Sequence, residues 1–117
     1  FIILDNVNYR KNYYQNRNKF LNKDNKEEWF TVPVEKKANS KLIKDVVLAE
    51  DYGWKYKLMK QMNMNFGLDM DTLQYIYEMD SLCICNMKSI DYCRMELGID
   101  TPYILSSELN VKVSLIF

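Results

Sequence analysis

The chain has 117 residues with 16 basic and 16 acidic side chains, and it contains no histidine. This length predicts one domain with one modest core, and zero net charge makes tight nucleic-acid binding by the whole surface unexpected. The lack of histidine excludes Ser-His and Cys-His nucleophilic pairs and zinc sites built on imidazole. Catalysis would therefore need carboxylates, lysine, tyrosine, a bound metal or the positioning of substrates.

Neither a membrane span nor a signal peptide is expected. No apolar run approaches the roughly 20 residues that cross a bilayer, and Asp5 interrupts the apolar start at once. The three cysteines are odd in number, which favours reduced thiols in a cytoplasm. The chain starts at Phe1 without methionine and stops on an apolar run. We therefore expect one domain over residues 1–117 that is truncated at both ends.

The first half of the chain predicts three strands and one long loop. Residues 1–4 are apolar and include β-branched isoleucines, which predicts a buried strand near 1–5 that runs into Asp5. Residues 6–28 are polar and rich in asparagine, which predicts a loop with a helical turn near 13–20. Strand-forming residues at 29–34 and 42–49 predict two more strands.

The second half predicts helices over 52–64, 70–79 and 82–97, followed by a strand near 102–106 and a final strand over 111–117. The helix over 82–97 has the clearest pattern, because its small and apolar residues recur at helical spacing. Ser81 precedes it as an N-cap candidate, and Gly98 follows it where a terminating glycine belongs. The order of elements predicts an α/β fold with a mixed sheet of short strands.

The most informative segment is residues 5–19, DNVNYRKNYYQNRNK, which we call the basic segment. Arginine offers a planar fork to phosphate or carboxylate groups, and amides suit sugar hydroxyls. The segment therefore favours an anionic, hydroxyl-rich ligand. Two alternatives remain: a solvated loop whose asparagines satisfy turns, and a single-stranded nucleic-acid binder that stacks bases on tyrosine. The candidate ligand-binding residues are Arg10, Lys11, Gln15, Asn16, Arg17, Asn18 and Lys19.

Asp5 stands at the carboxyl end of the first predicted strand, the edge where ligands collect in open α/β sheets. A carboxylate in this place could bind a metal, orient a basic side chain or act as a base. The alternative is an aspartate that caps the loop.

Three weaker patterns favour structural roles. Asp69-Met70-Asp71 resembles the D-x-D signature by which many glycosyltransferases hold a divalent ion, but acids are also favoured in the first turn of a helix. The cysteines at 83, 85 and 93 lack the spacing of metal ligands, so we expect buried packing. The lysines at 55, 57 and 60 either reach a phosphate or form a solvated helix face.

Four patterns in order resemble the WbqC-like family: FIILDNVNYRKNYYQNRNK, WFTVPV, Trp54 with Lys57, and the late LGIDTP. The family's leading Q-P-x-Y-x-P-W-x-G-Y segment is absent, and Leu58 replaces the histidine that follows the family's lysine. The matching residues are Asp5, Val7, Tyr9, Lys11, Gln15, Asn16, Arg17, Asn18, Trp29, Thr31, Val32, Pro33, Val34, Trp54, Lys57, Leu97, Gly98, Ile99, Thr101 and Pro102.

The resemblance implies a cytoplasmic bacterial transferase, of an acyl or aminoacyl (glycine) type, that acts on a nucleotide-linked amino sugar for O-antigen-type surface polysaccharides. Asp5 and Lys11 are then the catalytic candidates, and the other basic-segment residues, with Thr31 and Lys57, bind the substrate. The alternative is a non-catalytic sugar- or nucleotide-binding domain, or an inactive fragment of the enzyme. The expected partner is a nucleotide sugar or another anionic small molecule. The sequence indicates no metal site, and it does not specify a cofactor or an oligomeric state.

Overall fold

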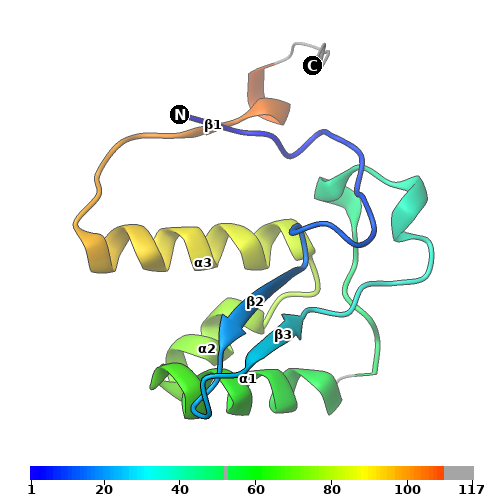
Figure 1. Cartoon of the computed structure of the whole chain (residues 1–117). Helices are drawn as coiled ribbons and strands as arrows, with labels where there is room; N and C mark the ends of the chain where they lie inside the picture. The colour runs from blue at the N-terminus through cyan, green and yellow to red at the C-terminus, as the bar shows by residue number, and fades with distance from the viewer. Residues whose placement is uncertain (52, 110–117) are drawn as a thin grey trace.

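The computed structural model describes residues 1–51 and 53–109, and within them it confirms a mixed α/β fold of helices and short strands (Figure 1). The predicted final strand over 111–117 and the first residue of the helix predicted over 52–64 lie outside the described residues. The elements are β1 (Ile2–Ile3), β2 (Arg17–Leu21), β3 (Glu27–Thr31), α1 (Gly53–Phe66), α2 (Met70–Tyr77), α3 (Leu82–Leu97) and β4 (Ile104–Leu105).

The basic segment leads directly into a strand, so the loop predicted over 6–28 is too long and its helical turn near 13–20 is wrong. β2 pairs antiparallel with β3 in a register that sets Arg17 opposite Thr31 and Lys19 opposite Trp29. The connection between the two strands is closed by the backbone bond from Asn22 N to Lys26 O at 3.0 Å. Pairing with β3 stabilises β2, although the polar sequence of β2 does not predict a strand.

Residues 42–49 do not form the predicted strand. A short 3-10 turn occupies Ile43–Asp45, and its first two amides donate to the carbonyls of Val7 and Asp5 at 2.8 and 2.9 Å. Farther along, Leu48 N donates to Asp80 O at 2.8 Å. Because its partners lie in separate loops, the segment forms isolated bridges rather than a ladder. It ties the start of the basic segment to the turn before α3.

The three helices agree with their predicted positions, and α3 ends as its sequence indicates. The side chain of Ser81 accepts a hydrogen bond from Ile84 N at 3.2 Å, which satisfies one free amide of the first turn. Gly98 has a φ of 66°, in the left-handed region, and its N–H contacts the carbonyls of Arg94 and Met95.

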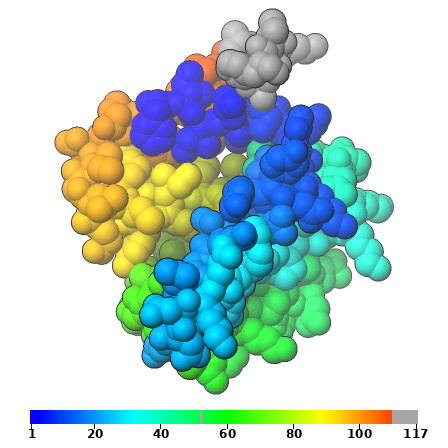
Figure 2. All heavy atoms as spheres, viewed as in Figure 1, coloured from blue at the N-terminus to red at the C-terminus, as the bar shows by residue number. Residues whose placement is uncertain are grey.

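The hydrophobic core lies where the helices meet the β2–β3 hairpin and the segment that follows it, and Figure 1 shows how these elements are arranged. In Figure 2 the hairpin, coloured blue to cyan, lies in front against the green atoms of the helices. Leu73 of α2 and Leu82 of α3 are fully buried, and Val46 and Leu48 of the irregular segment are 1% exposed. Phe20 and Phe30 project from the hairpin toward the helices, and Phe20 contacts Phe66 of α1 edge to face with ring centroids 5.1 Å apart. The core therefore fixes the hairpin on the helices.

β1 and β4 form a separate parallel pair that lies above α3 in Figure 1. Ile2 is paired with Ile104 and Ile3 with Leu105, so the first residues of the chain run beside residues about 100 positions later. None of the helices in residues 1–51 and 53–109 has both the length and the apolar character needed to cross a membrane.

Candidate functional site

The basic segment is folded into a defined path by contacts of its backbone. Tyr9 is 5% exposed, and its N–H donates to Lys41 O at 2.9 Å. Arg10 N donates to the side-chain oxygen of Gln15 at 2.8 Å, which closes the turn between them. Asn12 within that turn has a φ of 67°, a left-handed conformation that asparagine tolerates. These contacts fix the backbone path of the segment, although the side chains of residues 10–14 remain exposed.

Arg17 is the best-positioned cation of the basic segment. Its terminal nitrogen donates to Asn12 O at 2.6 Å, and its guanidinium lies 4.3 Å from the ring centroid of Trp29. The Nε atom is buried and has no hydrogen-bond partner among the described residues. Lys19 lies 5.0 Å from the same ring and pairs with Glu27 at 3.1 Å. Trp29 therefore orients both cations, and Arg17 keeps an unused donor.

A cavity of about 300 Å³ brings together four of the predicted site residues. We call it the basic pocket. Lys36 is a cation that the sequence reasoning missed, and its only signal was the adjacent pair Lys36-Lys37. Burial raises the pKa of Tyr9, and the charge of Arg17 opposes this rise. The lining residues are Tyr9, Lys11, Asn12, Asn16, Arg17, Thr31, Val34, Glu35, Lys36, Ala38 and Asn39.

Asn16 joins the basic pocket to the hairpin. Its side-chain amide donates to Val32 O at 3.0 Å, and its backbone oxygen accepts from Val32 N at 2.8 Å. One N–H of the side-chain amide is thus occupied, and the amide oxygen can accept a hydrogen bond from a ligand hydroxyl.

The remaining predicted residues lie outside the basic pocket. Arg10 is exposed and lies 5.8 Å from the Tyr13 ring centroid. Lys57 lines a separate cavity of about 400 Å³ between α1 and β3, and Thr31 lines this cavity as well as the basic pocket. Gln15, Asn18 and Lys19 face a third cavity on the other side of the hairpin. The structure thus divides the predicted site into three neighbouring hollows.

Asp5 is 3% exposed and its carboxylate is held by two serines. Ser106 Oγ and Ser107 N donate to one carboxylate oxygen at 3.1 and 2.9 Å, and Ser107 Oγ donates to the other at 2.5 Å. Burial alone would raise the pKa of Asp5, but these hydrogen bonds outweigh it, so the pKa lies below its ordinary value. A carboxylate of this kind is a weak base. We call this contact the Asp5 clasp.

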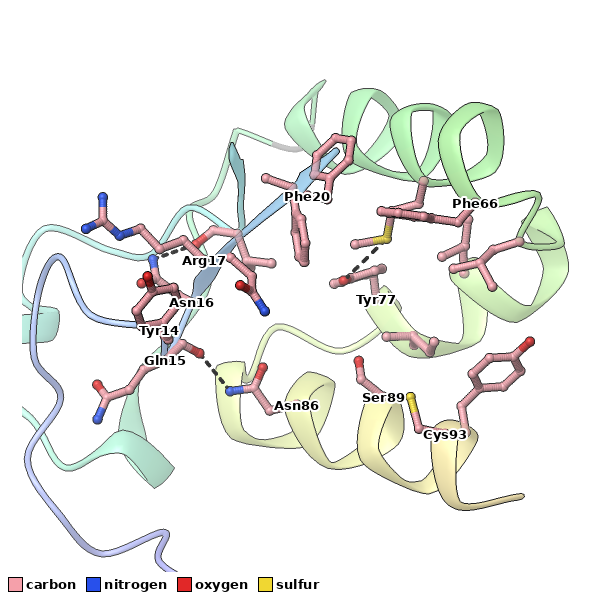
Figure 3. Close-up of a pocket in the computed structure, with 18 of the residues that line it drawn as sticks. Tyr14, Gln15, Asn16, Arg17, Phe20, Phe66, Tyr77, Asn86, Ser89 and Cys93 are labelled. Carbon is pink, nitrogen blue, oxygen red and sulfur yellow. Dashed lines mark hydrogen bonds between the residues drawn. The ribbon is translucent and has the colours of Figure 1, made fainter. Parts of the chain in front are cut away.

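The third cavity, of about 630 Å³, lies between the hairpin and the three helices (Figure 3). We call it the apolar pocket, since aromatic and aliphatic side chains such as Phe20, Phe66 and Tyr77 make up most of its wall. Polar residues lie at one end, where Asn86 Nδ2 donates to Gln15 O at 2.9 Å. Asn16 and Arg17 line both this pocket and the basic pocket.

The weaker sequence patterns have structural explanations, with one correction. Asp69 stands at the N-cap of α2, although its side chain makes no capping bond. No group of three or more acidic or cysteine side chains within residues 1–51 and 53–109 is arranged to hold a metal. Cys85 is buried and Cys83 half-buried, and burial raises the pKa of both thiols. Cys93 is exposed, so the prediction that it is buried is wrong. Lys55 pairs with Asp80 at 2.9 Å.

The fold and the pockets together define a small α/β protein with a polar, cation-lined cavity beside a larger apolar one. A model of the WbqC-like protein family matches residues 1–115, and the chain therefore belongs to that family. Searches of curated proteins and of solved structures each returned no significant match.

Proposed function

We propose that the chain is the substrate-binding part of a cytoplasmic bacterial transferase that modifies a nucleotide-linked amino sugar during surface polysaccharide (O-antigen) biosynthesis. The group transferred is an acyl or aminoacyl group such as glycine. Membership of the WbqC-like family supports the substrate class, and the basic pocket supports an anionic ligand. The reaction takes place by positioning and charge stabilisation rather than by a histidine base, which the chain lacks.

The observation that carries this proposal is the state of Arg17. Holding an arginine in one orientation before the ligand arrives reduces the entropy that binding must overcome. Asn12 and Trp29 hold this guanidinium, while its buried Nε atom has no partner among the described residues. A phosphate that enters the basic pocket would form charge-assisted bonds with this guanidinium.

Other residues take roles around Arg17 according to their chemistry. Lys11 and Lys36 add positive charge to the diphosphate side of the basic pocket. Lys11 remains the catalytic candidate, because an ammonium group there can donate a hydrogen bond to the charge that develops on the reacting group. The oxygen of Asn16 and the hydroxyl of Thr31 contact the sugar hydroxyls. Arg10, Gln15, Asn18, Lys19 and Lys57 form a second ring of contacts for the parts of the substrate that extend beyond the pocket.

Asp5 is assigned a positioning role in this proposal instead of the role of a base. Its carboxylate oxygens accept from Ser106 and Ser107, and it lies at the point where β1 enters the basic segment. The carboxylate therefore fixes the start of the segment that carries the ligand-binding residues.

Calorimetric titration with UDP-glucosamine tests the anion site directly. Arg17→Ala should weaken binding at least tenfold, since a hydrogen bond to a charged group contributes about 1.5–3 kcal/mol. Arg17→Lys should recover only part of this loss, because an ammonium lacks the planar fork. Lys26→Ala, in the exposed β2–β3 connection, removes an equal charge outside the basic pocket and should leave the affinity unchanged. Equal affinities for Arg17→Ala and Lys26→Ala would refute the site.

A second candidate function is a binding domain without catalysis, and the Asp5 clasp favours it. The carboxylate that the sequence offers as a base is buried and already accepts three hydrogen bonds. Incubation with UDP-glucosamine and an aminoacyl donor, followed by mass spectrometry of the sugar, separates the two functions. The same assay is run on a version that carries the family's leading Q-P-x-Y-x-P-W-x-G-Y segment. Product from either version supports the transferase, and binding without product from both supports the binding domain.

A further inference from the structure

Tyr77 brings to the apolar pocket a buried hydroxyl that has no strong hydrogen-bond partner among the described residues. Tyr77 is 6% exposed and projects from α2 toward the centre of the pocket (Figure 3). Among the described residues, its hydroxyl has a single hydrogen-bond partner, the sulfur of Met62 at 3.8 Å. A thioether is a weak acceptor. A buried hydroxyl usually finds a strong partner, so this donor is available to an acceptor that enters the pocket.

The charges near the apolar pocket are turned away from its interior. The guanidinium of Arg17 bonds to Asn12 O, and in Figure 3 it points away from the pocket. Lys19 pairs with Glu27. Ser89 donates its hydroxyl to Cys85 O at 2.9 Å within α3. Around Tyr77 the described residues of the pocket are therefore mostly apolar, while Ser89 and Tyr92 add hydroxyls on the α3 wall and the charged groups of Arg17 and Lys19 are engaged outside the interior.

We propose that the apolar pocket binds the neutral acyl part of a ligand, with the acyl carbonyl oxygen accepting a hydrogen bond from Tyr77. A cavity of about 630 Å³ is within the usual range of roughly 300–1,000 Å³ for small-molecule sites, which are mostly apolar with a few placed polar groups. A nucleobase fits less well, because its edge carries several donors and acceptors that the interior would leave unpaired. The choice of an acyl group as the ligand rests on the proposed transferase function. The cavity and the Tyr77 hydroxyl are features of the structure and do not depend on that function.

The apolar and basic pockets share Asn16 and Arg17 in their walls. An acyl group in the apolar pocket and an anion in the basic pocket would thus lie on opposite sides of Asn16 and Arg17. This arrangement suits a protein that brings an acyl donor and a charged acceptor together.

The test is a titration of the full chain, labelled with ¹³C in its methionine methyl groups, with the neutral probe N-methyloctanamide. Met62 lines the pocket and should shift on binding, whereas Met79, which is exposed and outside the pocket, should not. Tyr77→Phe removes only the hydroxyl and should weaken binding about fivefold, the worth of one net hydrogen bond. Tyr75→Phe on the exposed face of α2 is the matched control and should bind like the unaltered chain.

Two further measurements complete the test. Ser89→Leu fills the pocket with a residue that suits a helix and should reduce binding at least tenfold. Octanoate should bind more weakly than the amide, because its charge would be buried without a cation. The proposal is overturned if Met62 does not shift at saturation, if Tyr77→Phe binds as tightly as Tyr75→Phe, or if octanoate is preferred. The probe carries neither phosphate nor sugar, so its failure would leave the UDP-glucosamine result unaffected.

Discussion

Replacing Asp5 with alanine tests whether this carboxylate serves the structure or the chemistry. The change removes the acceptor of three hydrogen bonds from Ser106 and Ser107. Ser106 has a second acceptor, Asn6 Oδ1 at 2.5 Å, and the exposed Ser107 can turn to water. The loss therefore corresponds to about one charge-assisted bond, or about 2–3 kcal/mol in the free energy of unfolding at neutral pH. Urea denaturation followed by circular dichroism measures it.

The dependence on pH gives the same test a second readout. The hydrogen bonds lower the pKa of Asp5 in the folded state. The contribution of Asp5 to the free energy of unfolding is therefore complete above the ordinary pKa of 3.8. It is lost as pH falls from that value through the folded-state pKa. The stability difference between the original chain and Asp5→Ala should thus be constant from pH 7 to 5 and shrink in more acidic solution.

Two other substitutions isolate the cause. Asp5→Asn keeps one oxygen acceptor and should lose less stability than Asp5→Ala. Asp24→Ala removes an exposed carboxylate in the β2–β3 connection and should change stability by less than about 0.5 kcal/mol. A normal unfolding free energy for Asp5→Ala, combined with abolished transferase activity, would refute the positioning role and return Asp5 to the role of a base.

The remaining predictions concern the core, two helix ends and one buried phenol. Leu82→Ala empties a fully buried position and should cost about 2–5 kcal/mol in chemical denaturation. Ser81→Ala should cost about 1 kcal/mol in the same assay, because the first turn of α3 loses its capping acceptor. Gly98→Ala should lower the free energy of unfolding by about 1–2 kcal/mol. The loss comes from the left-handed backbone alone, because an added Cβ meets no atom within 4 Å. Gly53→Ala is the control and should not destabilise the protein, because Gly53 does not have a positive φ. Burial, with a smaller contribution from Cys85, raises the pKa of Tyr77 to about 12, so its contribution to stability should fall as pH rises from 10 to 12. Tyr77→Phe should reduce the overall fall and leave the part that comes from the other groups with raised pKa values, such as Tyr9.

Helix α3 shows which parts of the fold the sequence determines locally. Ser81 and Gly98 form their capping hydrogen bonds with residues three or four positions away. The ends of the helix can therefore be predicted from the local sequence. β2 was missed because Arg17–Leu21 carries charged side chains on one face and an asparagine beside Phe20 on the other. Its stability comes from pairing with β3 and from Phe20 packing on Phe66 of α1. That contact joins positions far apart in the chain, which local patterns do not reveal.

The candidate site divides in the same way. The basic segment was recognisable because arginines and amides in close succession have a common chemistry, and the structure brings Lys11, Asn16 and Arg17 to one pocket. The partners of Asp5 were not recognisable, because Ser106 and Ser107 follow it by about 100 residues. The position of Tyr77 was not recognisable either, since nothing in the sequence shows which buried tyrosine lacks a strong hydrogen-bond partner. Its place in the apolar pocket depends on elements from three parts of the chain.

The Asp5 clasp and the pairing of β1 with β4 have a consequence for the order of folding. They join residues separated by 101 or 102 positions, and closing a loop of that length carries an entropy cost of roughly 4 kcal/mol from its length alone. The hairpin and the helices close much shorter loops, so they are expected to assemble first and the clasp last. Substitutions in the clasp should then accelerate unfolding and leave the refolding rate nearly unchanged. The segment that carries the basic pocket would thus acquire its final anchor only after the core beneath it has formed.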